Sequence, residues 1–349
     1  MTHELKDGAI DVSVVVIGRN EGARLARCIE SVRRADWASI RWELIYVDSH
    51  STDGSPQTAR RLGARVQSLG EQPPCAAAGR NIGWRAACGE TVLFLDGDTV
   101  LDAAFVGRAL AVLRADLQLV AVWGHRRESN PAQSIYTRVL DLDWVFAPGR
   151  VDYFGGDALV RRQALAGVGG FDDSLVAGEE PELCRRLRAA GGSIEHIDAP
   201  MTSHDLAITT ARAWWRRAER AGLAYAQVAA RYAGTPDPLW SAEARHNRQR
   251  AGLLLVALAL LLAAAWLQPA AAAALLLAGL PPWARSARRC RWKCPRQPAL
   301  AWAYAAHSHL QQLPILAGQW RWWRLRRARR APRLIEYKAA APARTGARR

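Results

Sequence analysis

Residues 251–284 form an unbroken stretch of 34 residues without Asp, Glu, Lys, Arg or His. An apolar segment of this length is typical of a chain that enters lipid. One straight helix over it would be about 51 Å long, far more than the ~30 Å of bilayer hydrocarbon, and Pro269 interrupts it. A break at Gln268-Pro269 leaves the arms Leu253–Leu267 and Ala270–Leu280, which are about 22 and 16 Å long, so neither spans the hydrocarbon alone.

Basic residues flank this stretch on both sides. The positive-inside tendency therefore predicts that both flanks lie on the cytoplasmic side, which favours a re-entrant or kinked hairpin over a single crossing. The alternative is a pair of helices buried in a protein core. The flanking cations are Arg245, Arg248 and Arg250 before the stretch, and Arg285, Arg288, Arg289, Arg291 and Lys293 after it.

The C-terminal part also carries the net charge. The whole formal net charge of +16 arises in residues 281–349, which hold 17 Lys and Arg against the single acid Glu336. The first 280 residues are neutral overall, with 31 basic and 31 acidic residues. This distribution disfavours a nucleic-acid binder, whose charge would cover the folded body.

Eight of the 15 tryptophans lie at or beyond Trp240, several beside the arginines of 321–330. Such a mixture is typical of a helix in the lipid headgroup region, although a solvated face or an RNA-binding run has a similar composition. We expect residues 236–338 to form a membrane-associated hairpin followed by an amphipathic aromatic and basic helix. Residues 339–349 are expected to be disordered.

From residue 10 to about residue 235, short apolar runs alternate with helical patterns, which predicts an α/β domain with a mostly parallel sheet. Polar residues follow three of the expected strands, at Asn20-Glu21, Asp48-Ser49 and Asp96-Gly97-Asp98. Ligands of open α/β sheets bind beyond the carboxyl ends of the strands, so these residues are expected to share one crevice. The expected strands are 12–17, 43–47 and 91–95, and the expected helices are 21–35 and 56–62.

Two carboxylates, Asp96 and Asp98, stand two residues apart and point to the same side if the extended geometry persists. Such a pair suits a hard divalent ion that is shared with substrate phosphates. Taken alone, the pair is weak evidence for a metal site, because acidic loop tips are common. The turn after Asp48 is likewise compatible with a plain helix cap.

Four motifs in fixed order make the sequence resemble the family 2 glycosyltransferases of the GT-A fold, over about residues 10–235. The resemblance implies a Rossmann-like catalytic domain with a mostly parallel sheet, a nucleotide-sugar donor and Mn2+ or Mg2+. The motifs are Val47-Asp-Ser-His-Ser-Thr-Asp-Gly-Ser55, Gly79-Arg-Asn-Ile-Gly83, Gly89-Glu-Thr-Val-Leu-Phe-Leu-Asp-Gly-Asp98, and Gly169-Gly-Phe-Asp-Asp173 followed by Gly178-Glu-Glu-Pro-Glu-Leu-Cys-Arg-Arg-Leu187.

The resemblance also implies roles around the nucleotide. Asp48 matches the acid that reads the base, and Glu21 matches a residue near the same pocket. Arg80 matches the arginine of the family's R-N-x-G element, and Asp96 is implied to face the ribose and the metal. Asp157, in a Gly-Gly-Asp turn, is expected either to contact the donor sugar or acceptor or to stabilise the turn.

For catalysis, the resemblance implies that Asp98 is the direct metal ligand and that His204 completes the metal site. Glu180 matches the second acid of the family's Glu-Asp motif, its catalytic base. An inverting transfer needs one carboxylate to take the proton of the acceptor hydroxyl. A divalent ion can neutralise the leaving diphosphate. His204 on its own is also consistent with a buried structural histidine.

The sequence departs from the family pattern at three positions. Gly18 replaces the usual proline after the first strand, and Ser49 replaces one acid of the base pocket. The Glu-Asp pair is Glu179-Glu180, so the side chain at the base position is longer by about one methylene. None of these changes removes a group that the mechanism requires.

These observations predict a metal-dependent inverting glycosyltransferase at the cytoplasmic membrane, with its catalytic domain facing the cytoplasm. The expected donor is a nucleotide-sugar, with a UDP-sugar favoured. The expected acceptor is a lipid-linked glycan or a polyprenyl phosphate, in assembly of the cell envelope or an exopolysaccharide. The alternative is a non-catalytic, nucleotide-binding membrane scaffold of a glycan-assembly complex. A partner nucleic acid is not expected.

Overall fold

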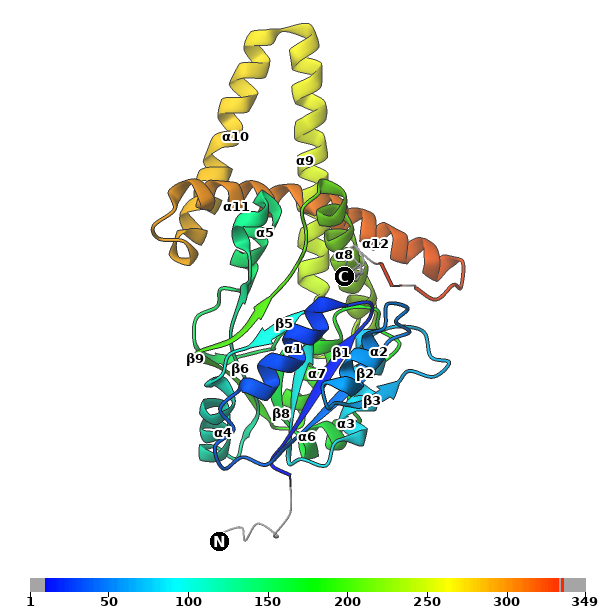
Figure 1. Ribbon diagram of the computed structural model, residues 1–349. Coiled ribbons are helices and arrows are strands. Elements are labelled where there is room, and N and C mark those ends of the chain that lie inside the picture. Colours follow the sequence, from blue (N-terminus) through cyan, green and yellow to red (C-terminus); the bar gives the residue numbers. More distant parts are fainter. Residues whose placement is uncertain (1–9, 333, 336–349) are drawn as a thin grey trace, which may run out of the picture. The chain divides into compact units, whose positions relative to one another are not determined.

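The computed structural model describes residues 10–332 and 334–335 (Figure 1). These residues form two compact units: residues 10–130 with 146–207, and residues 131–145 with the described residues from 208 onward. The predicted disordered tail, 339–349, lies outside the described residues. The predicted domain limits, 10–235 and 236–338, stay predictions.

The first unit is built on one sheet with the strand order β3-β2-β1-β4-β8-β6-β9-β5, and β7 is added to β9. The four strands from β3 to β4 are parallel, β6 is parallel to β9, and β8 runs antiparallel to both of its neighbours. The strands are β1 Val12–Gly18, β2 Trp42–Asp48, β3 Arg65–Ser68, β4 Thr91–Asp96, β5 Thr99–Leu101, β6 Leu119–Glu128, β7 Gly149–Val151, β8 Ala158–Arg161 and β9 Ser193–His204.

The central strands are continuous apolar runs because the sheet is covered by helices on both faces. Val14, Val15 and Val16 of β1 are all fully buried. The helices of this unit are α1 Ala23–Arg34, α2 Ser55–Arg61, α3 Ala76–Ala86, α4 Phe105–Ala115, α6 Arg162–Val168 and α7 Glu179–Ala189. Each strand and helix expected here forms within two residues of its predicted ends, and the predicted mixed α/β fold with a mostly parallel central sheet is confirmed.

The second unit is helical. The chain forms a hairpin of α9 and α10 (yellow in Figure 1), and its break falls where the sequence predicts it, because α9 ends at Leu267 and α10 begins at Pro269. The elements of this unit are the 3-10 turns η1 Pro131–Gln133, η2 Leu142–Trp144 and η3 Arg291–Lys293, and the helices α5 Ile135–Asp141, α8 Ala211–Arg231, α9 Ser241–Leu267, α10 Pro269–Cys290, α11 Pro298–Leu310 and α12 Gln312–Arg327.

The apolar arms of the hairpin are exposed. Leu253, Leu262 and Trp266 are 71%, 64% and 89% accessible, so the alternative of a buried pair of core helices does not hold. Among the described residues, α9 is the one helix that is long and apolar enough to cross a membrane by length and composition, with a mean hydropathy of 2.2. It extends back to Ser241, well before the predicted arm, because residues 241–252 contain no helix breaker ahead of Gly252.

Helices α8 and α12 pack backbone to backbone. Gly222 of α8 lies against the carbonyl group of Ile315, and Gly318 of α12 lies against that of Glu219, so a Cβ at either glycine would collide with backbone. This close contact fixes α12 on α8. Trp320 and Trp323 of α12 remain 63% and 42% exposed.

Candidate active site

The register of the sheet brings three strand ends to one edge. Gly18 at the end of β1 lies opposite Asp48 of β2, and Ile17 of β1 lies opposite Asp96 of β4. Parallel strands share their carboxyl edge, so the predicted polar strand exits meet in one region, as the sequence pattern indicates.

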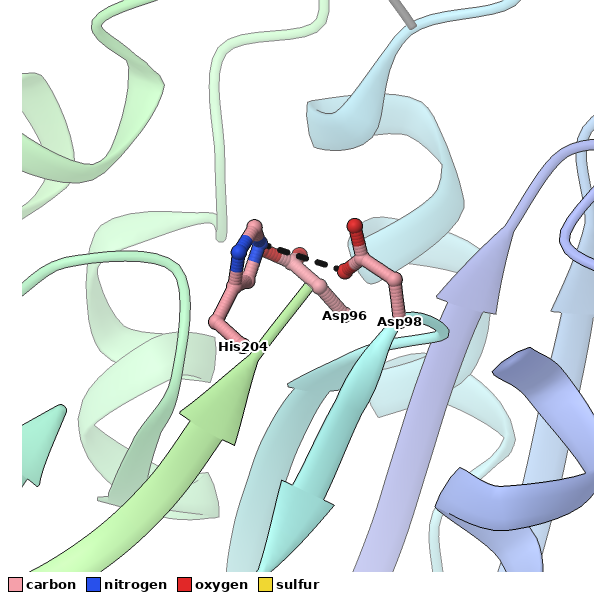
Figure 2. Close-up of side chains that lie close together, drawn as sticks. All are labelled: Asp96, Asp98 and His204. Atoms are coloured by element: carbon pink, nitrogen blue, oxygen red, sulfur yellow. Dashed lines mark ion pairs between the residues drawn. The ribbon is translucent and has the colours of Figure 1, made fainter. Parts of the chain in front are cut away.

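Asp98 lies against His204. After β4 the chain turns at Gly97, whose N–H donates to the carbonyl oxygen of Ile17 at 2.7 Å. Strand β5 then runs antiparallel to the end of β9, with Thr99 opposite His204. As a result, Asp98 Oδ1 and His204 Nε2 are 3.2 Å apart. Figure 2 marks this ion pair with a dashed line.

Asp96, Asp98 and His204 form a candidate metal centre. One ligand atom from each lies within 4.8 Å of the others. Burial, and after it the charge of Arg126, lower the pKa of His204 to about 4, so the imidazole is neutral at pH 7 and suited to metal ligation. Two carboxylates and an imidazole fit a divalent ion.

Arg80 of α3 connects this centre to the two glutamates at the start of α7. Its side chain is buried, and its Nη2 donates to Asp96 Oδ1 at 3.0 Å. Its Nη1 donates to Glu179 Oε1 at 2.9 Å and lies 3.2 Å from Glu180 Oε1. One guanidinium group therefore fixes the distance between the predicted base and the Asp96 carboxylate.

Of the two glutamates, Glu180 is the one that can meet a substrate. Its side chain is 17% exposed, whereas that of Glu179 is 3% exposed. Burial and the neighbouring charge of Glu179 raise the pKa of Glu180 to about 7, although the Arg80 cation opposes the shift. A carboxyl group with such a pKa is suited to take a proton near neutral pH.

Asp157 supports the end of β4. It accepts hydrogen bonds from the backbone N–H of Asp96 at 3.0 Å and from the Thr202 hydroxyl at 2.7 Å, and it is 2% exposed. These contacts hold the ends of β4 and β9 together, and the expected stabilisation of the turn by Asp157 stays a prediction. Its predicted contact with donor or acceptor stays a prediction.

Asp48 ends β2, which is separated from β4 by β1, and Glu21 follows β1. Asp48 accepts from the Tyr46 hydroxyl at 3.0 Å and from the N–H of Ser51 at 2.9 Å, while burial raises the pKa of Tyr46 and keeps it a neutral donor. Glu21 pairs with Arg24 at 2.9 Å. The sequence-predicted residues thus fall into one contact cluster and one neighbouring pair, Asp48 and Glu21. The cluster contains Arg80, Asp96, Asp98, Asp157, Glu180 and His204.

Arg126 of β6 belongs to the cluster and was not predicted. Its Nη2 donates to Asp96 Oδ2 at 3.1 Å, and its Nε lies 3.5 Å from Asp157 Oδ2. Gly156 packs against the same groups, since a Cβ there would lie 2.7 Å from Asp96 Oδ2 and 3.0 Å from Arg80 Nη2. The sequence feature that could have pointed to Arg126 is the adjacent pair Arg126-Arg127, but such pairs are too common to indicate a site.

The chain matches two family profiles. That of glycosyl transferase family 2 covers residues 13–166, and that of glycosyl transferase family group 2 covers residues 91–310, more than half of the chain. The pre-mycofactocin glycosyltransferase of Mycobacterium tuberculosis is 30% identical over 246 residues, which are 66% of this chain and 50% of that protein.

The "Probable glycosyltransferase YdaM" of Bacillus subtilis is 25% identical over 227 residues, 60% of this chain and 54% of that protein, so the chain spans about half the length of these relatives. The solved structure of mannosyltransferase PcManGT from Pyrobaculum calidifontis, in complex with GDP-Man and Mn2+, is 23% identical. It superposes with a TM-score of 0.65 over 92% of this chain and 91% of its own, which is a likeness of fold. The chain belongs to the family 2 glycosyltransferases and has their GT-A fold.

Proposed function

We propose that the protein is a metal-dependent inverting glycosyltransferase that moves a sugar from a nucleotide-sugar to a lipid-linked glycan or polyprenyl phosphate at the cytoplasmic face of the membrane. Assembly of a cell-envelope or exopolysaccharide glycan is the process that this reaction would serve. The observation that carries the proposal is the cluster at the sheet edge, where Arg80 joins Glu180 to Asp96 beside the Asp98–His204 pair.

Glu180 acts as the general base. With a glycan acceptor, the hydroxyl oxygen forms a bond to the anomeric carbon, the bond from that carbon to the diphosphate oxygen breaks, and the Glu180 carboxylate takes the hydroxyl proton. A polyprenyl phosphate attacks through an ionised phosphate oxygen, which has no proton to give up. Arg80 holds the carboxylate at 3.2 Å during this transfer. The partly exposed side of Glu180 is the side from which the acceptor approaches.

Asp98 and His204, with Asp96 beside them, would hold the divalent ion, which when bound neutralises charge on the leaving diphosphate. Asp48 orients the nucleotide through its carboxylate, which Tyr46 and Ser51 hold in place. The GDP-Man and Mn2+ in the related mannosyltransferase support this class of donor and ion. A UDP-sugar remains the favoured donor, and GDP-sugars belong in the same test.

The membrane assignment is supported by the second unit. The exposed apolar hairpin is matched to lipid, and α12 presents Trp320 and Trp323 together with arginines, as helices in the headgroup region do. Arg324 stacks on Trp320 with 5.0 Å between the guanidinium carbon and the ring centroid. A lipid-borne acceptor suits an enzyme that is held at the bilayer surface.

The proposal is tested by nucleotide release from UDP-, GDP- and dTDP-sugars, using purified protein, Mn2+ and a native lipid extract. We expect release from one donor, with labelled sugar recovered in the lipid phase. A purely water-soluble product would contradict the lipid acceptor. Nucleotide binding without turnover of any donor would instead favour the non-catalytic scaffold.

We expect activity to rise with pH through a midpoint near 7. Below that pH, Glu180 is protonated because its pKa is raised to about 7, and a protonated carboxyl cannot accept the acceptor proton. A kcat/KM profile measures this acid limb. In Glu179→Gln the midpoint should move down, since the negative charge that helps to raise the Glu180 pKa is gone. A wild-type midpoint at the ordinary glutamate value of 4.5 would contradict the assignment.

A further inference from the structure

Two guanidinium groups share the carboxylate of Asp96. Arg80 Nη2 donates to Oδ1 at 3.0 Å, and Arg126 Nη2 donates to Oδ2 at 3.1 Å. Arg80 comes from α3 and Arg126 from β6, so the two cations reach Asp96 from separate elements of the first unit. Both oxygens of a candidate metal ligand are therefore engaged by protein cations.

The fold is built around this arrangement. Arg126 is 9% exposed, and its Nε lies 3.5 Å from the buried Asp157, which in turn holds the backbone of Asp96. A Cβ on Gly156 would lie 3.3 Å from Arg126 Nη1, so the glycine turn closes over the guanidinium. Asp96, Asp157 and Gly156 therefore confine the Arg126 side chain, which can leave Asp96 only when another anion binds it.

The charge of Arg126 reaches the other ligands. Arg126 Nη2 lies 3.1 Å from Asp96 Oδ2, and Asp96 shares the candidate centre with Asp98 and His204. A cation this close to the ligand set opposes the entry of a divalent ion by Coulomb repulsion. An anionic diphosphate reverses this effect, because it offsets the repulsion and offers the guanidinium new acceptor oxygens.

We propose that Arg126 is a positioning residue that keeps Asp96 in place and weakens divalent-ion binding until a nucleoside diphosphate is present. This inference rests on the proposed function, since it assumes that the Asp96, Asp98 and His204 cluster takes the ion. Arg126 thereby couples the two ligands: the diphosphate offsets the guanidinium charge and tightens binding of the ion, and by reciprocity the bound ion tightens binding of the diphosphate by the same factor. The coupling favours loading of the ion together with the donor.

The test is the affinity for Mn2+ alone, measured by electron paramagnetic resonance of the full chain. In Arg126→Gln we expect Mn2+ to bind about 10-fold more tightly than in the wild type, within the range of about 5–150-fold usual for coupled sites. The factor by which UDP or GDP tightens Mn2+ binding should fall by the same amount. A residue with a merely structural role would weaken Mn2+ binding on removal rather than strengthen it.

Arg127→Gln is the matched control, because Arg127 is the next residue on β6 and is exposed. It should leave both affinities at the wild-type values. Arg126→Lys keeps the charge and should keep the weak binding of Mn2+. Unchanged or weaker Mn2+ binding in Arg126→Gln would overturn the inference, even where the wild type binds Mn2+ and releases nucleotide as proposed.

Failure of the proposed function is visible separately, in the wild type. If wild-type protein binds no Mn2+ with or without UDP or GDP, both the metal site and the role of Arg126 are wrong. Arg126→Met provides a second neutral variant of similar length in case Arg126→Gln does not fold. If melting curves show that neither neutral variant folds, Arg126 is needed for the fold itself and the inference is overturned.

Discussion

Glu180→Gln is expected to lower turnover by about 10²–10⁴-fold, the usual contribution of a general base. The amide has nearly the size of the carboxyl group and can still accept from Arg80 through its oxygen, so the α3–α7 contact persists. It cannot take the proton of the acceptor hydroxyl. We therefore expect the affinity for the nucleotide to stay within a few fold of the wild type while release of nucleotide from the donor nearly stops.

Glu180→Asp is the matched control. It restores the acid found at this position of the family motif and keeps a carboxylate, at a reach shorter by one methylene. Turnover should lie between that of the wild type and that of Glu180→Gln. Full activity in Glu180→Gln would remove the residue from the base role and direct attention to Glu179, which bonds to the same guanidinium at 2.9 Å.

The edge of the sheet that carries the site was predictable because its determinants are local. Strands β1, β2 and β4 each contain a run of four or more apolar residues, and the polar residues that follow these runs lie next to them in the chain. Parallel pairing then brings Asp48 and Asp96 to one edge without any further information. The resemblance to the family motifs pointed to Glu180 of α7 and to His204 at the end of β9.

Arg126 could not be predicted from the sequence, because its position depends on the pairing of β6 with β9, a strand far away in the chain. The second half of β6 is polar, from His125 to Glu128, and does not have the apolar pattern of a strand. It becomes a strand because it pairs with β9, with irregular register, about 75 residues further on. Only that pairing places Arg126 beside Asp96 and Asp157.

The hydrogen bonds of Asp157 were unpredictable for the same reason. Its partner Thr202 is 45 residues away, and the N–H of Asp96 is 61 residues away. In the sequence, a Gly-Gly-Asp turn shows only that a tight turn is present. The support that Asp157 gives to the end of β4 follows from the antiparallel pairing of β8 with β4, in which Ala158 lies opposite Phe94.

The second large effect is expected for Asp98→Asn. The substitution keeps the size of the side chain and removes the charge that faces His204 at 3.2 Å, so the candidate centre loses one of its two carboxylates. A neutral amide is a much poorer ligand for a hard divalent ion than a carboxylate. Mn2+ binding should become undetectable at concentrations that saturate the wild type.

Turnover of Asp98→Asn should fall by about 10²–10³-fold, comparable to the loss of one group that stabilises developing charge. The leaving diphosphate then departs with less of its charge neutralised, whereas Glu180 still takes the proton of the acceptor as before. Nucleotide release at saturating Mn2+, beside Mn2+ titration, measures both effects.

Asp102→Asn is the matched control, since Asp102 lies four residues further along and its carboxylate accepts from the N–H of Ala104 at 3.0 Å, which an asparagine also does. It should bind Mn2+ and turn over as the wild type does. Wild-type Mn2+ affinity in Asp98→Asn would place the ion elsewhere. Lost Mn2+ binding with wild-type turnover would show that the diphosphate leaves without the ion, and Arg80 and Arg126 would then be the cations nearest to it.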